Sequence, residues 1–301
     1  MKFVLVCLAL VGVTVAASGS SSTVQTRPPI LIDVAVSDET SHTIPGLTAA
    51  DFEVLIDGRS TPIESFAAPP VPLTLVLLLD RSESMAVYTD ADPIVDAFAE
   101  GVTAGDQAIV GGVASQLQLA TGFSGTKREV ISNARKALNF KKEERFGPSP
   151  IWDALAGAAA VLERKSGRRA IIFVTDGRGT GNRLSSAEAV ARAFYAGVTV
   201  QVLTEARTIV IRQDNDTAVR VRSGLMLQEL ARLTGGLSLP EYKPNMELPK
   251  PGPVIAQLVK DLRDMYTLGV LPEGATGTFH KIEVKVKRPN VSVRVRTGYR
   301  T

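Results

Sequence analysis

The sequence has almost no cysteine and few aromatic residues. Its single cysteine, Cys7, lies in an apolar run near the N-terminus, and Phe, Trp and Tyr make up 5% of the 301 residues. If that run is removed, the remaining chain has no thiol, which excludes disulfides, thiolate metal sites and a cysteine nucleophile. The scarcity of aromatic residues predicts a core built from Val, Leu, Ile and Ala.

Histidine is also rare, and the common nucleotide and hydrolase motifs are missing. A Ser-His-Asp hydrolase or a His-ligated metal would need His42 or His280 to meet the serines near Asp80, and we expect both to be structural. The run 122–126 fails as a Gly-x-Ser-x-Gly elbow because it ends in threonine, and no Walker-type phosphate loop is present. These absences favour a protein that is not an enzyme.

The charge balance gives no support to nucleic-acid binding. The formal net charge is +3 and the signs are mixed along most of the chain. Basic residues alternate with apolar ones near the C-terminus, which predicts a solvated sheet face; a polyanion-binding patch is the alternative. Hydrophobic residues make up 45% and charged residues 22%, as in folded globular proteins with a sizeable core.

The first residues have the pattern of a secretory signal peptide. Lys2 precedes an apolar run over residues 3–15, which is shorter than the ~18 to 20 residues that span a bilayer. Val15 and Ala17 fit the −3 and −1 positions of a cleavage site. We therefore expect a signal peptide at 1–17, a flexible lead-in at 18–29, and a secreted or periplasmic mature protein without a membrane span. A retained anchor is the alternative.

The rest of the chain divides into three segments. Residues 30–70 and 265–301 show short strand-like runs separated by turn residues. Residues 71–264 instead alternate helical patterns with mostly apolar runs at 73–79, 108–113, 170–175 and 198–203, as in strands buried on both faces. We predict an α/β fold, a doubly wound and mostly parallel Rossmann-like sheet, inserted in a small all-β sandwich that the two outer segments form together.

Oxygen-bearing side chains follow two of these predicted strands. Asp80 ends the run at 73–79, and Asp176 follows the run at 170–175. If both strands are parallel, the two carboxylates emerge at the edge where doubly wound sheets bind ligands. Ser82 and Ser84 alternate with Asp80 along the chain, and Ser149 adds a hydroxyl at a predicted helix start.

Two carboxylates and three hydroxyls form the ligand set that hard cations prefer. Mg²⁺ takes six oxygens at ~2.1 Å and usually keeps some waters. With few negative ligands the ion would remain electron-poor and could accept a carboxylate from outside. The alternative is that the three serines are helix caps and turn residues and that the two aspartates are ordinary strand-end residues.

The same residues lie in motifs that resemble a known family. The segments DRSESM (80–85), GPSPIWDAL (147–155) and TDG (175–177) resemble, in order and spacing, the three loops of the metal-ion-dependent adhesion site of von Willebrand factor A domains. The flanking segments GLTAADFEV (46–54), TGG (234–236) and YTLG (266–269) resemble the exported bacterial subgroup called VWFA-related, abundant in Acidobacteria. The resemblance covers nearly all of the mature chain.

The resemblance implies a divalent-cation-dependent module that binds proteins or mediates adhesion. It places the direct ligands of Mg²⁺, or of Mn²⁺ or Ca²⁺, on Ser82, Ser84 and Ser149, with Asp80 and Asp176 binding directly or through water. The partner would be a protein that presents an acidic residue to the cation. The oligomeric state is left open, and the alternatives are a structural envelope protein with a vestigial site and a metal-dependent hydrolase.

Two residues depart from the family pattern. Ser149 stands where threonine is usual, which keeps the hydroxyl but loses the methyl group that stiffens its rotamer. Glu83 replaces a residue that is commonly glycine. Glu83 adds negative charge beside the site. This charge is expected either to tighten binding of the cation or to repel an acidic ligand.

Overall fold

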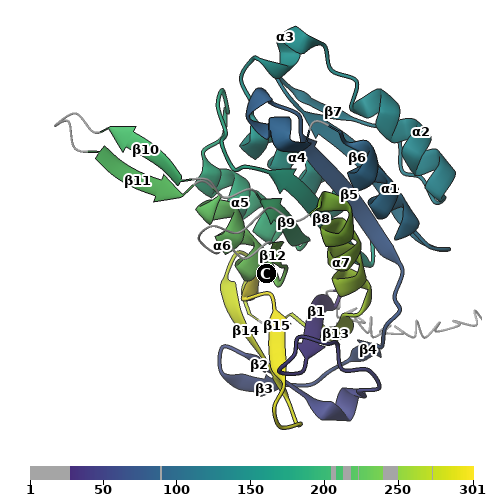
Figure 1. Cartoon of the computed structure of the whole chain (residues 1–301). Helices are drawn as coiled ribbons and strands as arrows, with labels where there is room; N and C mark the ends of the chain where they lie inside the picture. The colour runs from purple at the N-terminus through teal and green to yellow at the C-terminus, as the bar shows by residue number, and fades with distance from the viewer. Residues whose placement is uncertain are drawn as a thin grey trace, which may run out of the picture.

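A computed structural model describes residues 28–88, 90–204, 208–212, 218–222, 224–239, 250–272 and 274–301. The signal peptide expected at 1–17, and the lead-in up to residue 27, lie outside the described residues. The described chain forms an α/β part and a smaller part made only of strands (Figure 1).

The α/β part is built on a six-stranded sheet in the order β12-β9-β8-β5-β6-β7. All neighbours pair in parallel except β7, which is antiparallel to β6. The strands are β5 (Leu73–Asp80), β6 (Gln107–Val113), β7 (Leu117–Leu119), β8 (Arg168–Thr175), β9 (Thr199–Thr204) and β12 (Ser238–Leu239). Every residue of β5 is buried, so its largely apolar sequence reflects a strand covered on both faces.

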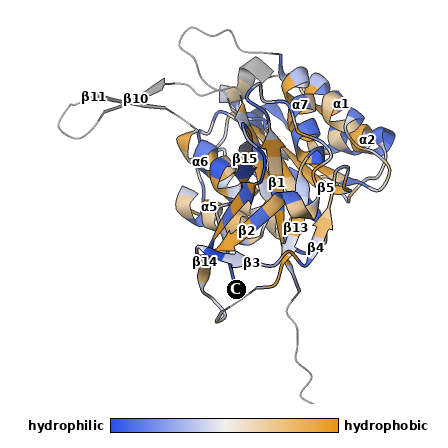
Figure 2. Cartoon of the chain, turned by 90° about the horizontal axis from the view of Figure 1, so that it is seen from below, coloured by the Kyte–Doolittle hydropathy of each residue, from blue (hydrophilic) through white to orange (hydrophobic). Residues whose placement is uncertain are grey.

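Within the described part of the chain, three helices cover each face of this sheet. Alternate residues of β5, such as Leu75 and Leu77, pack with α1 (Asp92–Glu100), α2 (Lys127–Ala137) and α7 (Pro251–Arg263). Val76 and Leu78 face the other way and pack with α4 (Ile151–Glu163), α5 (Ser186–Tyr195) and α6 (Leu225–Thr234). Figure 2 shows the difference in composition: β5 is mostly hydrophobic, whereas the helices carry both kinds of residue. The predicted doubly wound sheet is confirmed.

The helix ends show which local signals the sequence carries. Ser185 and Glu188 form a capping box at the start of α5, and α6 ends at Gly235 in the left-handed conformation, where glycine has no steric cost. The apolar residues of α2 are separated by many polar ones, and this helix was not predicted. Its start is marked by the Thr126 side chain, which accepts a hydrogen bond from the Glu129 N–H.

The outer segments form the predicted sandwich of two antiparallel sheets. Their orders are β15-β1-β13-β4 and β16-β14-β2-β3, so each sheet mixes strands from both ends of the chain. The strands are β1 (Ile30–Ser37), β2 (Phe52–Ile56), β3 (Arg59–Thr61), β4 (Ser65–Ala67), β13 (Tyr266–Val270), β14 (Phe279–Val286), β15 (Ser292–Val295) and β16 (Gly298–Arg300). Three aromatic rings, those of Phe52, Phe66 and Tyr266, meet between the sheets with centroids 5.4 to 6.0 Å apart.

Some elements differ from the predicted ones. One of the strand-like runs of the N-terminal segment, at 63–66, is observed as β4 and begins two residues later, while β3 and β7 were not predicted. These strands have only three residues each, which is too short for an alternating pattern to stand out. The Asp-Asn-Asp sequence at 214–216, with apolar residues on either side, predicts a hairpin within 208–223. The hairpin is present as β10 (Thr208–Arg212) paired with β11 (Ala218–Arg222), and it projects from the α/β part (Figure 1).

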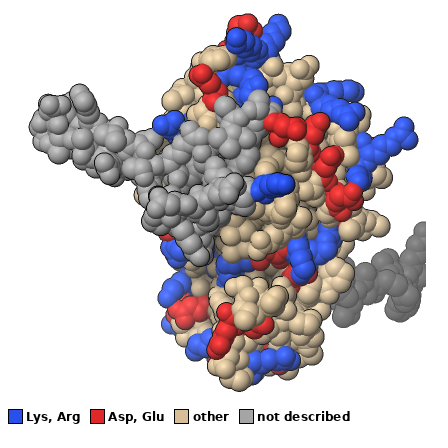
Figure 3. All heavy atoms as spheres, in the orientation of Figure 1, with Lys and Arg blue, Asp and Glu red and all other residues tan. Residues whose placement is uncertain are grey.

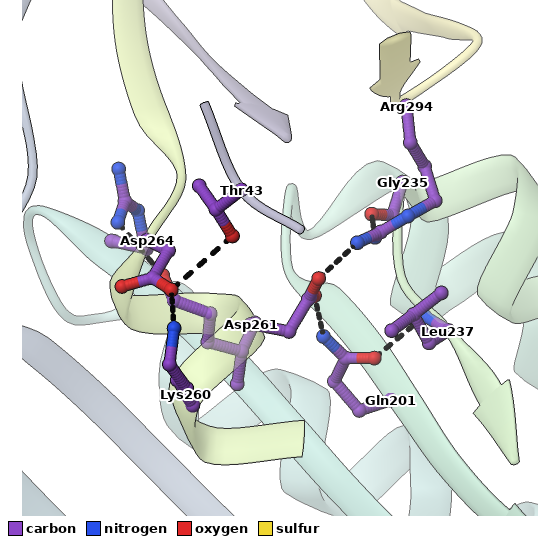
Figure 4. A network of polar contacts seen from close by, with 10 residues as sticks. Thr43, Gln201, Gly235, Leu237, Lys260, Asp261, Asp264 and Arg294 are labelled. Carbon is purple, nitrogen blue, oxygen red and sulfur yellow. Dashed lines mark hydrogen bonds and ion pairs between the residues drawn. The ribbon is translucent and has the colours of Figure 1, made fainter. Parts of the chain in front are cut away.

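Charged side chains join the two parts of the molecule. Arg294 of β15 donates to Asp261 of α7 and to the Gly235 carbonyl oxygen, and Asp261 also accepts from Gln201 Nε2 at 2.7 Å (Figure 4). Nearby, Asp264 accepts hydrogen bonds from Thr43 and Lys260. Both acids lie at the end of α7, so this helix is held against both the central sheet and the sandwich.

Asp106 anchors the first residue of β5. Its carboxylate accepts hydrogen bonds from the Leu73 and Thr103 N–H groups at 2.7 and 2.8 Å and from Arg263 at 2.5 Å. Burial alone would raise the pKa of this carboxyl, but the bonds from Arg263, Thr103 and Leu73 outweigh it and lower the pKa. The ionised carboxylate therefore stabilises the start of the strand that leads to Asp80.

We expect Asp106→Asn to lower the free energy of unfolding by about 1 to 2 kcal/mol at pH 7. Because the pKa of Asp106 is depressed in the folded state, its contribution is present above the unfolded value of about 3.9 and is lost as the pH falls through the folded value. Urea unfolding at pH 7 and at pH 3 measures both effects. A difference between wild type and variant that does not shrink in acid would contradict the assignment.

Candidate metal centre

The two predicted carboxylates lie at one edge of the central sheet. β5 ends at Asp80, and Asp176 directly follows β8. These strands are parallel neighbours, with Leu79 opposite Val174. The carboxyl ends of parallel strands share one edge, so the expected proximity of the two groups follows from this register.

Asp80 is the residue around which the site is organised. Its Oδ1 accepts hydrogen bonds from the Ser82 N–H at 3.0 Å and from Ser149 Oγ at 3.3 Å. Its Oδ2 accepts from Thr175 Oγ1 at 2.7 Å. The side chain is 3% exposed. Three segments far apart in the sequence therefore meet at one buried carboxylate, as the motif spacing predicted.

Ser82 and Ser84 contact each other at the start of a short helix. Their hydroxyl oxygens lie 3.1 Å apart, and the helix is the 3-10 segment η2 (Glu83–Tyr88). Ser82 is buried and Ser84 is half-buried. The tight turn after Asp80 thus brings both hydroxyls to the same end of β5.

Ser149 does not act as a helix cap, which was the alternative interpretation of this residue. α4 begins at Ile151, its N-cap position is Pro150, and no side chain caps it. The Ser149 hydroxyl instead points to Asp80, while its backbone N–H donates to Thr180 Oγ1 and its carbonyl accepts from the Thr180 N–H, both at 2.9 Å. Thr180 therefore fixes the segment that carries Ser149.

Asp176 is fully buried and only partly hydrogen-bonded. Its Oδ1 accepts from the Arg178 N–H at 2.9 Å, but within the described residues its Oδ2 has no hydrogen-bond partner. A buried carboxylate oxygen without a partner is costly, and such atoms usually face a water or an ion. This oxygen is the feature of the site that the protein's own described groups leave unsatisfied.

The electrostatics of the site favour a positive ion. Burial raises the pKa of the Asp80 carboxyl above its usual value, and the neighbouring charge of Asp176 raises it further, while hydrogen bonds from Ser82 and Thr175 oppose the shift. Two carboxylates in a buried place repel each other. A bound cation would offset both the desolvation and the repulsion.

Sequence reasoning missed the two threonines that support the site. Thr175 joins the two carboxylate segments, because its hydroxyl donates to Asp80 and also accepts from the Gly177 N–H at 3.1 Å. It directly precedes Asp176, so the TDG motif itself was the available signal. Thr180 lies in a loop without a periodic pattern of apolar residues, and no motif in the sequence indicated its role.

The loop after Asp176 is tied to the start of α4. The Trp152 N–H donates to Asn182 Oδ1 at 2.8 Å, and Asp153 accepts from the Arg183 and Leu184 N–H groups. The Trp152 side chain is buried and packs in the hydrophobic core between the central sheet and α4. The loops that carry Ser149 and Asp176 are therefore held together as one unit.

The donor set fits a hard cation and not a transition metal bound by His or Cys. Within the described part of the chain, no group of three or more His, Cys, Asp and Glu residues is arranged to hold a metal ion. The two histidines lie in the sandwich segments, where His280 Nδ1 is 2.8 Å from Asp57 Oδ2. Ser82, Ser84 and Ser149 with Asp80 and Asp176 supply the all-oxygen set that Mg²⁺ prefers.

Comparison with known proteins finds similarity in structure but not in sequence. No protein-family model and no curated protein matches the sequence. Proximal thread matrix protein 1 from the mussel byssus is similar in structure, with a TM-score of 0.51 and 14% identity over 70% of this chain and 51% of that one. This chain therefore spans about half of the mussel protein.

Two further structures extend the comparison. A von Willebrand factor type A protein from Catenulispora acidiphila has a TM-score of 0.46 and 11% identity, covering 92% of this chain and 75% of that one. The manganese-loaded TRAP protein of Plasmodium vivax has a TM-score of 0.41 and 14% identity over 83% and 100%. Proteins named as von Willebrand factor A domains are thus among the solved structures to which this chain is similar. The resemblance predicted from the sequence motifs is in line with this similarity.

Within the described residues, no helix is long and apolar enough to cross a membrane.

Proposed function

We propose that the A-type domain captures a partner protein through one divalent cation. Ser82, Ser84 and Ser149 would hold the ion, with Asp80 and Asp176 binding it directly or through water. The cation would be Mg²⁺, with Mn²⁺ or Ca²⁺ as the alternatives, and a carboxylate of the partner would complete its coordination. The observation that carries this proposal is the buried Asp176 Oδ2, which no described group of the chain satisfies.

The charge of the ligand set supports capture of an acidic group. Three of the five donors are neutral hydroxyls, so the set offers a dication two negative charges and leaves it electron-poor. A bound dication lowers the pKa of groups that it contacts and attracts anionic oxygen. The ion would therefore serve as a bridge between the buried edge of the sheet and a carboxylate of the partner.

Binding, rather than hydrolysis, fits the neighbourhood of the site. Metal-dependent hydrolysis needs a base that can take a proton from water. The only two histidines of the sequence lie in the strand segments of the sandwich, away from the end of β5. Asp80 itself accepts three hydrogen bonds, which orient it as a support for the neighbouring hydroxyls.

We also propose that the chain works outside the cytoplasm, in the periplasm or secreted. The support is the short apolar run over residues 3–15 followed by Ala16, Ala17 and Ser18. Mass spectrometry of the protein recovered from envelope and medium should give a mature chain that begins at Ser18. A protein recovered with Met1 and the apolar run intact would contradict the cleavage.

Ser149→Ala is expected to weaken Mg²⁺ binding by tenfold or more, on the order of 1.4 kcal/mol, because it removes one ligand without adding charge. Isothermal titration of the cation-free protein with MgCl₂ and MnCl₂ measures the change. Ser132→Ala is the matched control, since Ser132 is an exposed serine on α2. Equal affinities for the two variants would remove Ser149 from the proposed ligands.

Capture of a partner is tested with envelope extract passed over immobilised protein. Wild type should retain a protein in Mg²⁺ that EDTA elutes, and Ser149→Ala should retain less of it than Ser132→Ala. Retention that neither EDTA nor Ser149→Ala changes would reject the cation bridge.

A further inference from the structure

A groove lined by aromatic and basic side chains lies directly beside the candidate metal centre. Its volume is about 540 Å³, and its lining residues are Glu83, Phe140, Lys142, Arg145 and Phe146. The short helix α3 (Lys142–Arg145) supplies the basic residues. Figure 3 shows Lys and Arg side chains, with some Asp and Glu, gathered at the top of the molecule, where Figure 1 places α3.

Hydrogen bonds fix this groove relative to the metal centre. Arg145 Nε donates to the carbonyl oxygen of Arg81 at 3.0 Å, and Arg81 lies between Asp80 and Ser82 in the sequence. On the other side, the Ser115 N–H donates to the Glu144 carbonyl oxygen at 3.1 Å, which ties α3 to the end of β6. The groove therefore keeps a fixed position beside the serines that would hold the ion.

The wall of the groove includes an exposed aromatic ring. Phe146 is 57% exposed and lies three residues before Ser149. The Phe140 ring, by contrast, is half-buried and packs against β6. It lies so close to Gly112 of β6 that a Cβ at this position would come within 2.5 Å of the ring. Exposed aromatic rings next to a binding site commonly contribute contact area to a partner.

The charges of the groove favour an acidic partner segment. Lys142 Nζ lies 5.7 Å from the centroid of the Phe146 ring, so an ammonium group stands over the aromatic wall. Lys142 and Arg145 together bring two positive charges against the one negative charge of Glu83. The positive side of the groove complements carboxylates, and its aromatic side complements an apolar side chain.

We propose that this groove binds the residues next to the carboxylate that the cation holds, and that the partner segment there is acidic and carries a large apolar side chain. The apolar side chain would pack on Phe140 and Phe146, and a second carboxylate would face Lys142. This inference rests on the proposed function, because it assigns neighbours to the same captured acid. It goes further by stating which acidic segments are selected.

The test uses a phage-displayed library of random seven-residue peptides, selected on the full chain in MgCl₂ and eluted with EDTA. Three proteins are compared: wild type, Phe146→Ser, and Phe279→Ser as a matched control on an exposed phenylalanine of the sandwich, 50% exposed. Wild type and Phe279→Ser should enrich peptides with an acidic residue beside a large apolar one. Phe146→Ser should still enrich acidic peptides but lose the apolar preference.

Affinities of the enriched peptides give a second readout. We expect Phe146→Ser to raise their Kd by about tenfold and Lys142→Glu to raise it at least as much, whereas Lys285→Glu, on an exposed lysine of β14, leaves it unchanged. The Mg²⁺ affinities of Phe146→Ser and Phe279→Ser measured by titration should equal that of wild type, which also shows that these proteins are folded.

The selection distinguishes a failure of the groove proposal from a failure of the cation bridge. Acidic peptides eluted by EDTA without an apolar preference, or with one that Phe146→Ser leaves unchanged, would overturn the groove proposal alone. If no protein enriches any peptide that EDTA elutes, the cation bridge is wrong, and the groove proposal falls with it.

Discussion

Asp80→Asn is expected to raise the melting temperature of the cation-free protein and to abolish the further rise that Mg²⁺ gives to wild type. The two effects have opposite signs for stability, which makes this substitution informative. The stabilisation should be on the order of 1 kcal/mol, or about 2 to 4 °C for a domain of this size. The lost Mg²⁺ effect should be larger, since a ligand at 100 times its Kd stabilises by about 2.7 kcal/mol.

The physical reason is the cost of a buried negative charge. Asp80 is 3% exposed, and its pKa is raised by burial and by the neighbouring Asp176. An amide of the same shape removes that cost. It can still accept hydrogen bonds from Ser82 and Ser149 through its oxygen, and its NH₂ group can donate to Thr175. The fold is therefore retained, while the charge that would attract the cation is gone.

Differential scanning calorimetry with EDTA and with MgCl₂ measures both effects. Asp106→Asn serves as the control, because it also neutralises a buried acid but removes the partner of Arg263. That control should lower the melting temperature and keep the Mg²⁺ rise. If Asp80→Asn lowers the melting temperature without cation, or keeps the Mg²⁺ rise, Asp80 is a structural residue and the proposed ligand set is wrong.

The central sheet could be predicted because burial on both faces leaves a strong signal. The runs around Leu77 and Ile172 are apolar without interruption, and only strands covered by helices on both faces tolerate such a composition. The pairing of the outer segments followed from a count of strands, since neither segment has enough strands for a stable sandwich alone. Helix α2 was missed because much of it faces solvent and its apolar residues are few.

The residues of the candidate site could be predicted from the sequence, but the residues that hold them in place could not. Asp80, Ser82, Ser149 and Asp176 lie in short motifs whose spacing is visible in the sequence. Thr180 and Arg145 hold loops in place through hydrogen bonds with backbone atoms of distant segments, two between Thr180 and Ser149 and one from Arg145 to Arg81. Such contacts depend on the path of the loops and leave no periodic pattern. That the five site residues bind a cation stays a prediction.

Arg168→Ala is expected to lower the free energy of unfolding by about 3 to 5 kcal/mol, which is the largest effect on stability that we predict. Arg168 is 2% exposed at the start of β8. Its Nε donates to Asp33 Oδ1 at 2.9 Å, and its other nitrogens donate to the Leu262 and Met265 carbonyl oxygens at 2.8 Å and to Thr267 Oγ1 at 2.6 Å. One side chain thus joins the central sheet, the end of α7 and both central strands of a sandwich sheet.

The cost arises from what the truncation leaves behind. Without Arg168, the carboxylate of Asp33 keeps the hydrogen bond from the Thr267 hydroxyl at 2.7 Å, and two buried carbonyl oxygens lose the hydrogen bonds that Arg168 donates to them. Urea unfolding of Arg168→Ala is compared with that of Arg169→Ala, because the Arg169 guanidinium donates two long hydrogen bonds of 3.4 Å, to the Leu162 and Glu163 carbonyl oxygens. Arg169→Ala should cost less than about 1 kcal/mol. Equal costs for the two variants would show that Arg168 does not join the two parts of the molecule.

The same substitution also separates stability from cation binding. Arg168 and Asp176 lie at opposite ends of β8, roughly 25 Å apart at about 3.3 Å per strand residue. Substitutions this far apart without shared partners have effects that add within about 0.5 kcal/mol. The double variant Arg168→Ala with Asp80→Asn should therefore show the sum of the two single effects. Arg168→Ala alone should keep the Mg²⁺ affinity of wild type, because the buried residues between the two ends of β8 hold the metal centre in place.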